Sequence, residues 1–272
     1  MDTLPVITIQ SIKEDILAFL DDKDRQHWIY DYGQNRRSDV HGTDVFWYSQ
    51  MEVLFEDRYF QWLTYSALEE LNAEGEIIVV EQNNSKFFYR KGQRYYREKL
   101  KEKVELSEWL KSTNRSCGKH GEALTKTLFF ELGFKLVAKE TNEYQGKKWT
   151  ENDKDLDFIF EYGGLGFGVE VKNRLEYIKR DVFQIKMFDM CDFLGLIPIL
   201  VARMSPAIYI SRLDEHGGYT LIFKRKAFEY AYQEEVKEFW KKTLLPVNFT
   251  DELVFKKQKD KFQRWLDNKL SP

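Results

Sequence analysis

The sequence predicts an α/β protein with a mixed central sheet, preceded by a smaller α+β region. Two observations carry this prediction. Apolar residues recur at helical spacing in some segments, and they alternate with polar residues, as in strands, in others. In the second half of the chain these segments follow one another as helix, strand, strand, strand, helix and strand. We expect them to pack as one layered domain around a common core.

The composition excludes several classes of protein. The 272 residues carry 42 Lys and Arg against 45 Asp and Glu, so the total charge gives no sign of nucleic acid and local clusters matter more. Two distant cysteines argue against a disulfide scaffold and a cysteine-type zinc site. No apolar run reaches the roughly 18 residues of a membrane helix, and the N-terminus lacks a secretory signal. We therefore expect a cytoplasmic protein with no membrane partner.

A polar, turn-rich segment, KSTNRSCG over residues 111–118, predicts a linker between two domains. The first domain would span residues 1–110 and the second residues 118–272. Near the start of the first domain, isoleucines, leucines and a phenylalanine recur at helical spacing over residues 9–20. This stripe predicts an amphipathic helix.

A second helix and a β-hairpin are expected later in the first domain. Thr64 or Ser66 can cap the start of the helix and Gly75 can end it. Two apolar runs, IIVVEQ and KFFYRK, then flank an Asn-Asn turn, which predicts a hairpin. Helix, helix and two-stranded wing is the order of a winged helix. Over residues 8–105 the chain resembles that class of DNA-binding domain.

The predicted hairpin and its exit concentrate basic residues among aromatic ones. We expect Lys86, Arg90, Lys91, Arg94 and Arg97 to contact DNA; Lys99, Lys101 and Lys103 follow, and Phe87, Phe88, Tyr89, Tyr95 and Tyr96 lie between them. Lysine and arginine gain affinity for a phosphate backbone by releasing its condensed counterions. The same pattern is also typical of a solvated hairpin followed by a charged helix, and the sequence does not separate the two interpretations.

The elements of the second domain follow in a clear order. We expect a helix over 118–133 ended by Gly133, a strand over 134–140, a polar loop, a hairpin formed by 155–162 and 166–174, a helix over 176–195 and a buried strand over 196–203. Beyond this core, 207–213 and 219–223 are expected to be strands, and 224–241 and 251–269 to be helices.

Charged residues on the predicted hairpin suit metal-dependent phosphate chemistry. Side chains alternate along a strand, so Glu170 and Lys172 share one face while Val169 and Val171 point into the core. Asp157 lies on the partner strand. Carboxylates hold Mg²⁺ with part of its water shell retained. Such a metal activates water and stabilises charge on a phosphate, and Lys172 could orient that water.

The spacing Glu-x-Lys is not specific by itself, because the chain contains it twice. The second copy, Glu235-Val236-Lys237, lies in a segment with helical periodicity. Residues two apart on a helix point about 200° from one another, so these two side chains cannot form one site. The strand setting of the first copy is what makes it a candidate.

This arrangement resembles the PD-(D/E)XK nuclease superfamily over residues 118–203. In that family an aspartate opens an apolar stretch, here Asp157 before Phe-Ile-Phe, and an acid-x-lysine closes the next strand, here Glu170 to Lys172. Leu156 stands where the family usually has proline. Asp155 points the same way as Asp157, so both stay candidates for the metal ligand.

The resemblance implies two further site residues. The family's first helix often carries a glutamate that faces the metal, and Glu122 in GKHGE matches it. An acidic residue near a helix N-terminus can also be there only because it interacts favourably with the helix dipole. Its second helix often carries a polar residue near the site, and Gln184 is the best match, although a hydrogen-bonded glutamine at the edge of the core fits equally well.

The resemblance also implies a function. We expect Mg²⁺-dependent hydrolysis of double-stranded DNA, with Mn²⁺ as a substitute metal and a homodimer as the active form. Within the family a type II restriction endonuclease is favoured, and a repair or junction nuclease comes second. The alternatives from other classes are a non-catalytic DNA-binding regulator and a structural component of a larger defence complex.

Overall fold

The computed structural model describes residues 8–22, 44–254 and 256–270. The chain divides into two compact units, Met1–Thr113 with Glu234–Pro246, and Asn114–Gln233 with Val247–Pro272. Residues 234–246 thus belong to the first unit, although the sequence placed them in the second domain. Residues 1–7, which belong to the N-terminal segment where no secretory signal is expected, lie outside the described residues.

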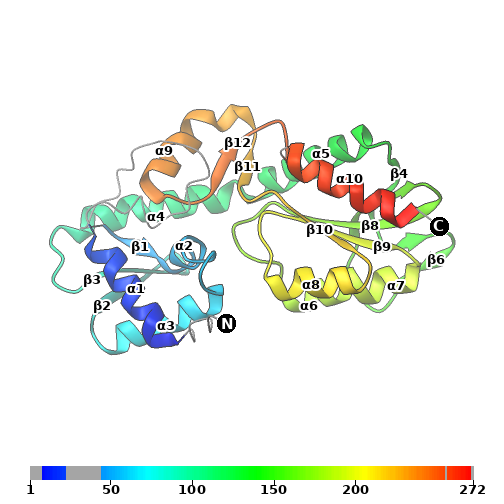
Figure 1. The fold of residues 1–272 in the computed structure, drawn as a ribbon. Helices are drawn as coiled ribbons and strands as arrows, with labels where there is room; N and C mark the ends of the chain where they lie inside the picture. Colours follow the sequence, from blue (N-terminus) through cyan, green and yellow to red (C-terminus); the bar gives the residue numbers. More distant parts are fainter. Residues whose placement is uncertain (1–7, 23–43, 255, 271–272) are drawn as a thin grey trace. The chain divides into compact units, whose positions relative to one another are not determined.

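The first unit combines helices with a three-stranded antiparallel sheet of order β1-β3-β2 (Figure 1). Its elements are α1 (Ile9–Asp21), β1 (Phe46–Trp47), α2 (Tyr48–Leu54), α3 (Gln61–Ala73), β2 (Ile77–Gln82), β3 (Ser85–Arg90), α4 (Tyr96–Ser112) and α9 (Gln233–Thr243). The predicted helix over 9–20 and the predicted hairpin are confirmed. The hairpin turns at Asn83 and Asn84, whose φ angles are 51° and 56°, a conformation that asparagine tolerates better than most residues.

The expected cap of α3 is wrong, but its end is confirmed. Thr64 lies inside the helix and is fully buried, and Phe60 precedes the first helical residue. Gly75 follows the helix with a φ of 71°, the left-handed conformation that glycine adopts most easily.

The expected linker over 111–118 is also wrong. Residues 111–112 end α4, and α5 (Asn114–Glu131) begins after the single residue Thr113. The Thr113 hydroxyl donates to the carbonyl of Leu110 at 2.9 Å, and both Leu110 and Cys117 are buried. Apolar residues at helical spacing therefore keep this polar segment helical, although the division between the two units falls here.

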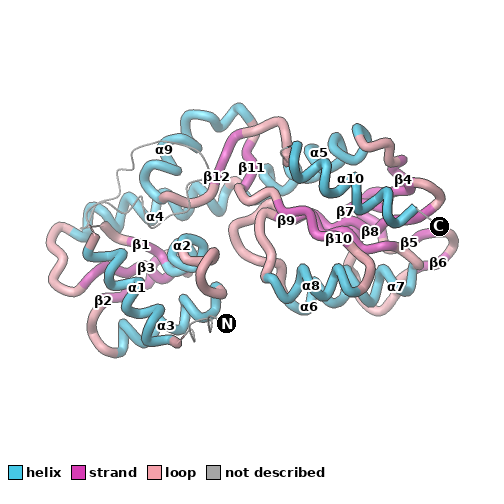
Figure 2. Tube along the Cα trace, viewed as in Figure 1, coloured by secondary structure: helices cyan, strands magenta, loops and turns pink. Residues whose placement is uncertain are grey.

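The second unit is built on a mixed five-stranded sheet of order β10-β9-β8-β7-β4 (Figure 2). Its strands are β4 (Lys135–Thr141), β7 (Leu156–Tyr162), β8 (Leu165–Lys172), β9 (Ile197–Ala202) and β10 (Tyr219–Ile222). β7 is antiparallel to β4 and β8, whereas β9 is parallel to β8 and β10 is parallel to β9. The mixed sheet and the core order helix, three strands, helix and strand are as predicted.

Helices cover both faces of this sheet. α5 and α10 (Lys256–Leu270) lie on one face; α6 (Arg180–Gln184), a π-helix (Ile185–Met190), α7 (Cys191–Leu194) and α8 (Ala207–Glu215) lie on the other (Figure 1). Val169 and Val171 of β8 pack in the core of the first face, as expected from the alternation. Gly168 and Glu170 therefore point to the second face.

Three smaller segments differ from the expectation. The polar loop after β4 contains a short hairpin of β5 (Glu143–Tyr144) and β6 (Lys147–Lys148). The segment 207–213 is not a strand but most of α8, and 224–241 begins as β11 (Lys226–Phe228), which pairs with β12 (Val247–Phe249), before α9. Leu213 is the one buried residue of α8. Only a narrow face of this helix packs against the sheet, so Ile208 and Ile210 remain exposed.

The described helices include none that is long and apolar enough to cross a membrane.

Candidate active site

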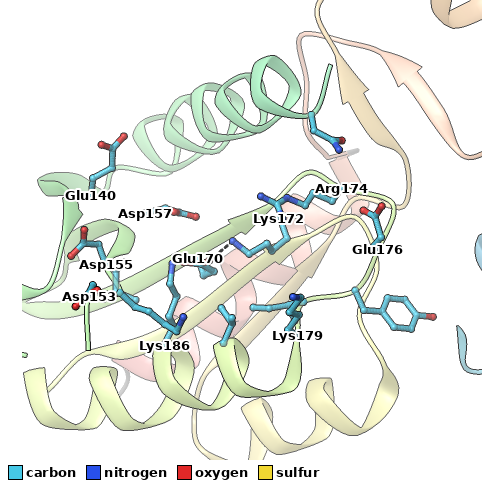
Figure 3. A pocket seen from close by; sticks show the side chains of 16 residues that line it. Glu140, Asp153, Asp155, Asp157, Glu170, Lys172, Arg174, Glu176, Lys179 and Lys186 are labelled. Carbon is cyan, nitrogen blue, oxygen red and sulfur yellow. Dashed lines mark hydrogen bonds and ion pairs between the residues drawn. The ribbon is translucent and has the colours of Figure 1, made fainter. Parts of the chain in front are cut away.

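A cavity of about 660 Å³ opens in the second unit beside the ends of β7 and β8 (Figure 3). Asp157, Glu170 and Lys172 line it, together with Lys186 from the π-helix. Among the other charged lining residues, Glu140, Asp153 and Asp155 lie on one side, and Arg174, Glu176 and Lys179 lie on the other; Lys154 also lines the cavity. The predicted pair of strands thus brings its three charged residues into one hollow.

Asp157 is held against the neighbouring strand. The backbone N–H of Val171 donates to its Oδ2 at 2.6 Å, which fixes the carboxylate beside Glu170. Burial, and secondarily the negative charge of Glu170, raise the pKa of Asp157 to about 6. The raised pKa means that the ionised form of Asp157 is poorly stabilised in this cavity. A cation bound nearby would stabilise that form.

Glu170 is the most enclosed member of the cluster, with no exposed surface. Its Oε1 is ion-paired with Lys172, two residues along the same strand. Its Oε2 lies 2.7 Å from Nζ of Lys186. A buried carboxylate is costly unless it is paired, and here each oxygen has its own ammonium partner.

Lys186 is a site residue that the sequence interpretation missed. Its side chain is only 12% exposed and points at Glu170 from the π-helix (Figure 3). Short π-helical segments inside α-helices often mark functional sites. Its only sequence signal is a lysine inside the apolar stretch IKMF, which could have been weighed beside Gln184.

Asn173 anchors the end of β8 and was likewise missed. Its side-chain amide donates to the carbonyls of Cys117 and Ala227, both at 2.7 Å, and its Oδ1 accepts from the amide of Ala227 at 2.8 Å. Gly121 of α5 permits this approach, since an added Cβ would lie 2.6 Å from the Cβ of Asn173. The strand end that carries Lys172 is therefore tied to α5 and β11.

Asp155 and Asp157 differ in their surroundings. Both line the cavity, but Asp155 is exposed and precedes the first residue of β7. Asp157 lies within the strand and bonds directly to β8. Asp157 is therefore the better placed of the two to share a cation with Glu170.

Glu122 and Gln184 are not brought into the cluster. Neither is among the residues that line the cavity. Glu122 lies on α5 and pairs with Lys139 at 3.3 Å, while α5 packs on the face of the sheet opposite to Glu170. The Gln184 amide donates to Asp189 at 2.8 Å and accepts from Arg212 at 2.9 Å, as a hydrogen-bonded glutamine at the edge of the core would.

The basic residues expected to contact DNA fall into two groups. Lys86 bonds to the Tyr65 hydroxyl at 3.0 Å and to Glu69 at 2.9 Å, and these hydrogen bonds raise the pKa of its ammonium. Arg90 pairs with Asp21 at 3.3 Å and with Glu76. By contrast Lys91, Arg94 and Arg97 are exposed.

Lys103, which follows these residues in the same charged run, is not on the surface. It is 1% exposed and pairs with Asp44 at 2.9 Å. Burial lowers the pKa of its ammonium.

The acidic side chains of the cavity suit a divalent cation only in part. Across the described residues, no three His, Cys, Asp or Glu side chains are grouped closely enough to hold a metal. Two adjacent carboxylates with hard oxygen donors nevertheless suit Mg²⁺, which usually keeps several waters and takes only one or two protein carboxylates. The raised pKa of Asp157 supports this fit, so Asp157 and Glu170 are the residues that would hold the ion.

No known protein-family model matches this chain, and no curated protein sequence resembles it significantly.

Proposed function

We propose that this protein is a Mg²⁺-dependent DNA endonuclease of the PD-(D/E)XK type. The observation that carries the proposal is the meeting of Asp157, Glu170 and Lys172 in one cavity, with Asp157 fixed by the Val171 amide. The element order of the second unit and its mixed sheet support a restriction-endonuclease-like fold. The substrate is double-stranded DNA, and a homodimer is the expected form for cutting both strands.

The residues divide the chemistry between them. When Mg²⁺, or Mn²⁺ in its place, is bound, it supplies a more acidic water and stabilises charge on the phosphate. Asp157 and Glu170 hold that ion. Lys172 donates from its ammonium to orient the attacking water, and its charge offsets the negative charge that develops on the phosphate.

The first unit is proposed to be a winged-helix-like DNA-binding unit. Its helices and strands follow the order α1, β1, α2, α3, β2, β3, and β1 joins the hairpin as a third strand. However, α3 contains no basic residue and ends near Glu69, Glu70 and Glu74. Contact with the phosphate backbone is therefore assigned to the exposed residues Lys91, Arg94 and Arg97 after the hairpin.

A non-catalytic DNA-binding regulator is the second candidate. The observation in its favour is that both oxygens of Glu170 are already occupied by lysine ammonium groups. In a regulator these pairs would serve only to stabilise the fold. The first candidate instead requires that a metal ion can take the place of one of them.

Cleavage of plasmid and phage DNA by the purified protein tests the proposal. Reactions with Mg²⁺ and with chelator are compared for the wild type, Glu170→Ala and Glu235→Ala. The last variant removes the acid of the second Glu-x-Lys copy, which lies exposed on α9. We expect metal-dependent cleavage that Glu170→Ala reduces on the order of 10³-fold and Glu235→Ala leaves intact. Cleavage that survives Glu170→Ala would contradict the assignment.

A further inference from the structure

One aromatic residue in the basic stretch after the hairpin is exposed, whereas its neighbours are not. Phe87 and Phe88 are buried in the first unit. Tyr89 stacks on Tyr96, with ring centroids 4.3 Å apart. Tyr95 alone of the five aromatics in this stretch projects into solvent, with 84% of its surface exposed.

The backbone of Tyr95 is also unusual. Its φ and ψ angles are 59° and 24°, in the left-handed region. This conformation costs an ordinary L residue about 1 kcal/mol or more, and residues held there often belong to binding sites. Core packing does not compensate this cost, because the ring touches solvent. A glycine or an asparagine would serve the turn better, so the turn alone does not explain a tyrosine.

Basic residues flank Tyr95 in the sequence. Residues 91–101 include five basic side chains and one acid, Glu98. Arg94, Arg97 and Lys101 are exposed and form no ion pair within the described part of the chain. Lys86 and Arg90, which precede them, are offset by acids. The unpaired positive charge of the stretch is therefore concentrated around Tyr95.

We propose that Tyr95 stacks on an unpaired nucleobase of DNA while Arg94 and Arg97 bind the adjacent phosphates. Paired bases in a duplex are stacked on one another and offer no free face to an aromatic ring. A base in a gap, overhang or mismatch does offer one, and stacking of this kind tolerates any sequence. Flanking arginines supply the attraction for phosphate.

This inference rests on the proposed function and narrows its substrate. A nuclease with such a contact acts on DNA that carries unpaired bases beside duplex. Among the two settings considered for the enzyme, it favours a repair or junction nuclease over a restriction endonuclease that reads intact duplex.

Binding of labelled DNA in the presence of chelator tests the inference without cleavage. The probes are a fluorescein-labelled duplex with a short single-stranded gap and its fully paired counterpart, followed by anisotropy. Tyr95→Gly removes the ring and suits the left-handed backbone, so its melting temperature should not be below that of the wild type. We expect its affinity for gapped DNA to fall about tenfold or more, and for paired DNA to change less than about twofold.

Two further variants sharpen the test. Tyr95→Trp keeps an aromatic face and should retain binding to the gapped duplex. Tyr230→Ala removes another exposed tyrosine, 52% exposed, from the second unit, and should bind both probes as the wild type does. A loss with Tyr95→Gly that is equal for both probes, or no loss, would overturn the inference, as would a wild type that binds neither probe.

The outcomes separate this inference from the proposed function. Protein that binds gapped DNA through Tyr95 but never cleaves it supports the contact and contradicts the nuclease. Protein that cleaves DNA with Mg²⁺ while Tyr95→Gly binds both probes normally supports the nuclease and overturns the contact.

Discussion

Nζ of Lys186 lies 2.7 Å from Oε2 of Glu170, so the buried carboxylate is neutralised by a residue from the π-helix as well as by Lys172 on its own strand. A metal ion bound to Glu170 and Asp157 would approach the same carboxylate. Lys186 and a metal ion would therefore compete for Glu170, and a metal bound at Oε2 would weaken the ion pair with Lys186.

Replacing Lys186 by Met should expose this competition. Without metal, Glu170 loses one of two ion-pair partners while buried, and we expect the free energy of unfolding to fall by about 2 kcal/mol. With Mg²⁺ the loss should shrink, because the ion then pairs with the vacated oxygen and binds more tightly than in the wild type. Urea unfolding with chelator and with a Mg²⁺ titration measures both effects.

Lys126→Met is the matched control, since Lys126 is exposed on α5 of the same unit. It should change neither the stability nor the Mg²⁺ dependence. Equal Mg²⁺ affinity in Lys186→Met and the wild type would contradict the competition.

Replacement of Asp155 and of Asp157, the two candidate metal ligands, should affect activity to very different degrees. Asp157→Asn should reduce Mg²⁺-dependent cleavage on the order of 10³-fold, because its carboxylate is fixed by the Val171 amide beside Glu170. Asp155→Asn should reduce it less than about tenfold, because Asp155 is exposed and lies outside β7. Single-turnover rates on one substrate measure the contrast, and the reverse order would make Asp155 the metal ligand.

The stability of the metal-free protein should depend on pH through Asp157. Its pKa is raised from 3.8 to about 6 in the folded protein. Between these values the folded state retains a proton that the unfolded chain has released, so the free energy of unfolding falls as pH rises through this window. Urea unfolding in chelator should show this decline, and Asp157→Asn should flatten it. A decline of equal size in the variant would assign it to another group.

Salt dependence of DNA binding should distinguish paired from unpaired basic residues. Arg94 is exposed and forms no ion pair with any residue that the structure describes, whereas Lys86 is paired with Glu69. Arg94→Ala should therefore lower the slope of log affinity against log salt by about 0.9, the value of one phosphate contact, and Lys86→Ala should leave it nearly unchanged. Equal effects of the two variants would mean that Glu69 does not hold Lys86 away from DNA.

The hairpin of β7 and β8 could be predicted because it depends on the alternation of residues within a short stretch of sequence. Alternation assigned Val169 and Val171 to the core and Glu170 to the other face, as observed. The segment 207–213 was mistaken for a strand because Ile, Tyr and Ile stand together, which favours strands intrinsically. In the structure the segment is a helix whose Leu213 packs in the core. This tertiary contact could not be predicted from the sequence.

The residues around Glu170 could be predicted only in part. Gln184 was chosen and Lys186 was missed, because the helix has apolar residues on several sides and the sequence does not show which face points toward the site. In addition, the π-helix over Ile185–Met190 changes which side chains share a face, and a period of 3.6 residues does not describe this change. Similarly, nothing in the charge run distinguishes the buried Lys103 from the exposed Arg97, since burial there depends on Asp44, far away in the sequence.

The rate of DNA cleavage by Lys172→Ala, set beside Lys237→Ala, tests the central claim most directly. Both variants remove the lysine of a Glu-x-Lys triplet, but Lys172 lines the cavity and Lys237 lies on α9. At saturating Mg²⁺ we expect Lys172→Ala to lose activity by about 10²-fold or more and Lys237→Ala to match the wild type. Full activity in Lys172→Ala would contradict a catalytic cluster of Asp157, Glu170 and Lys172.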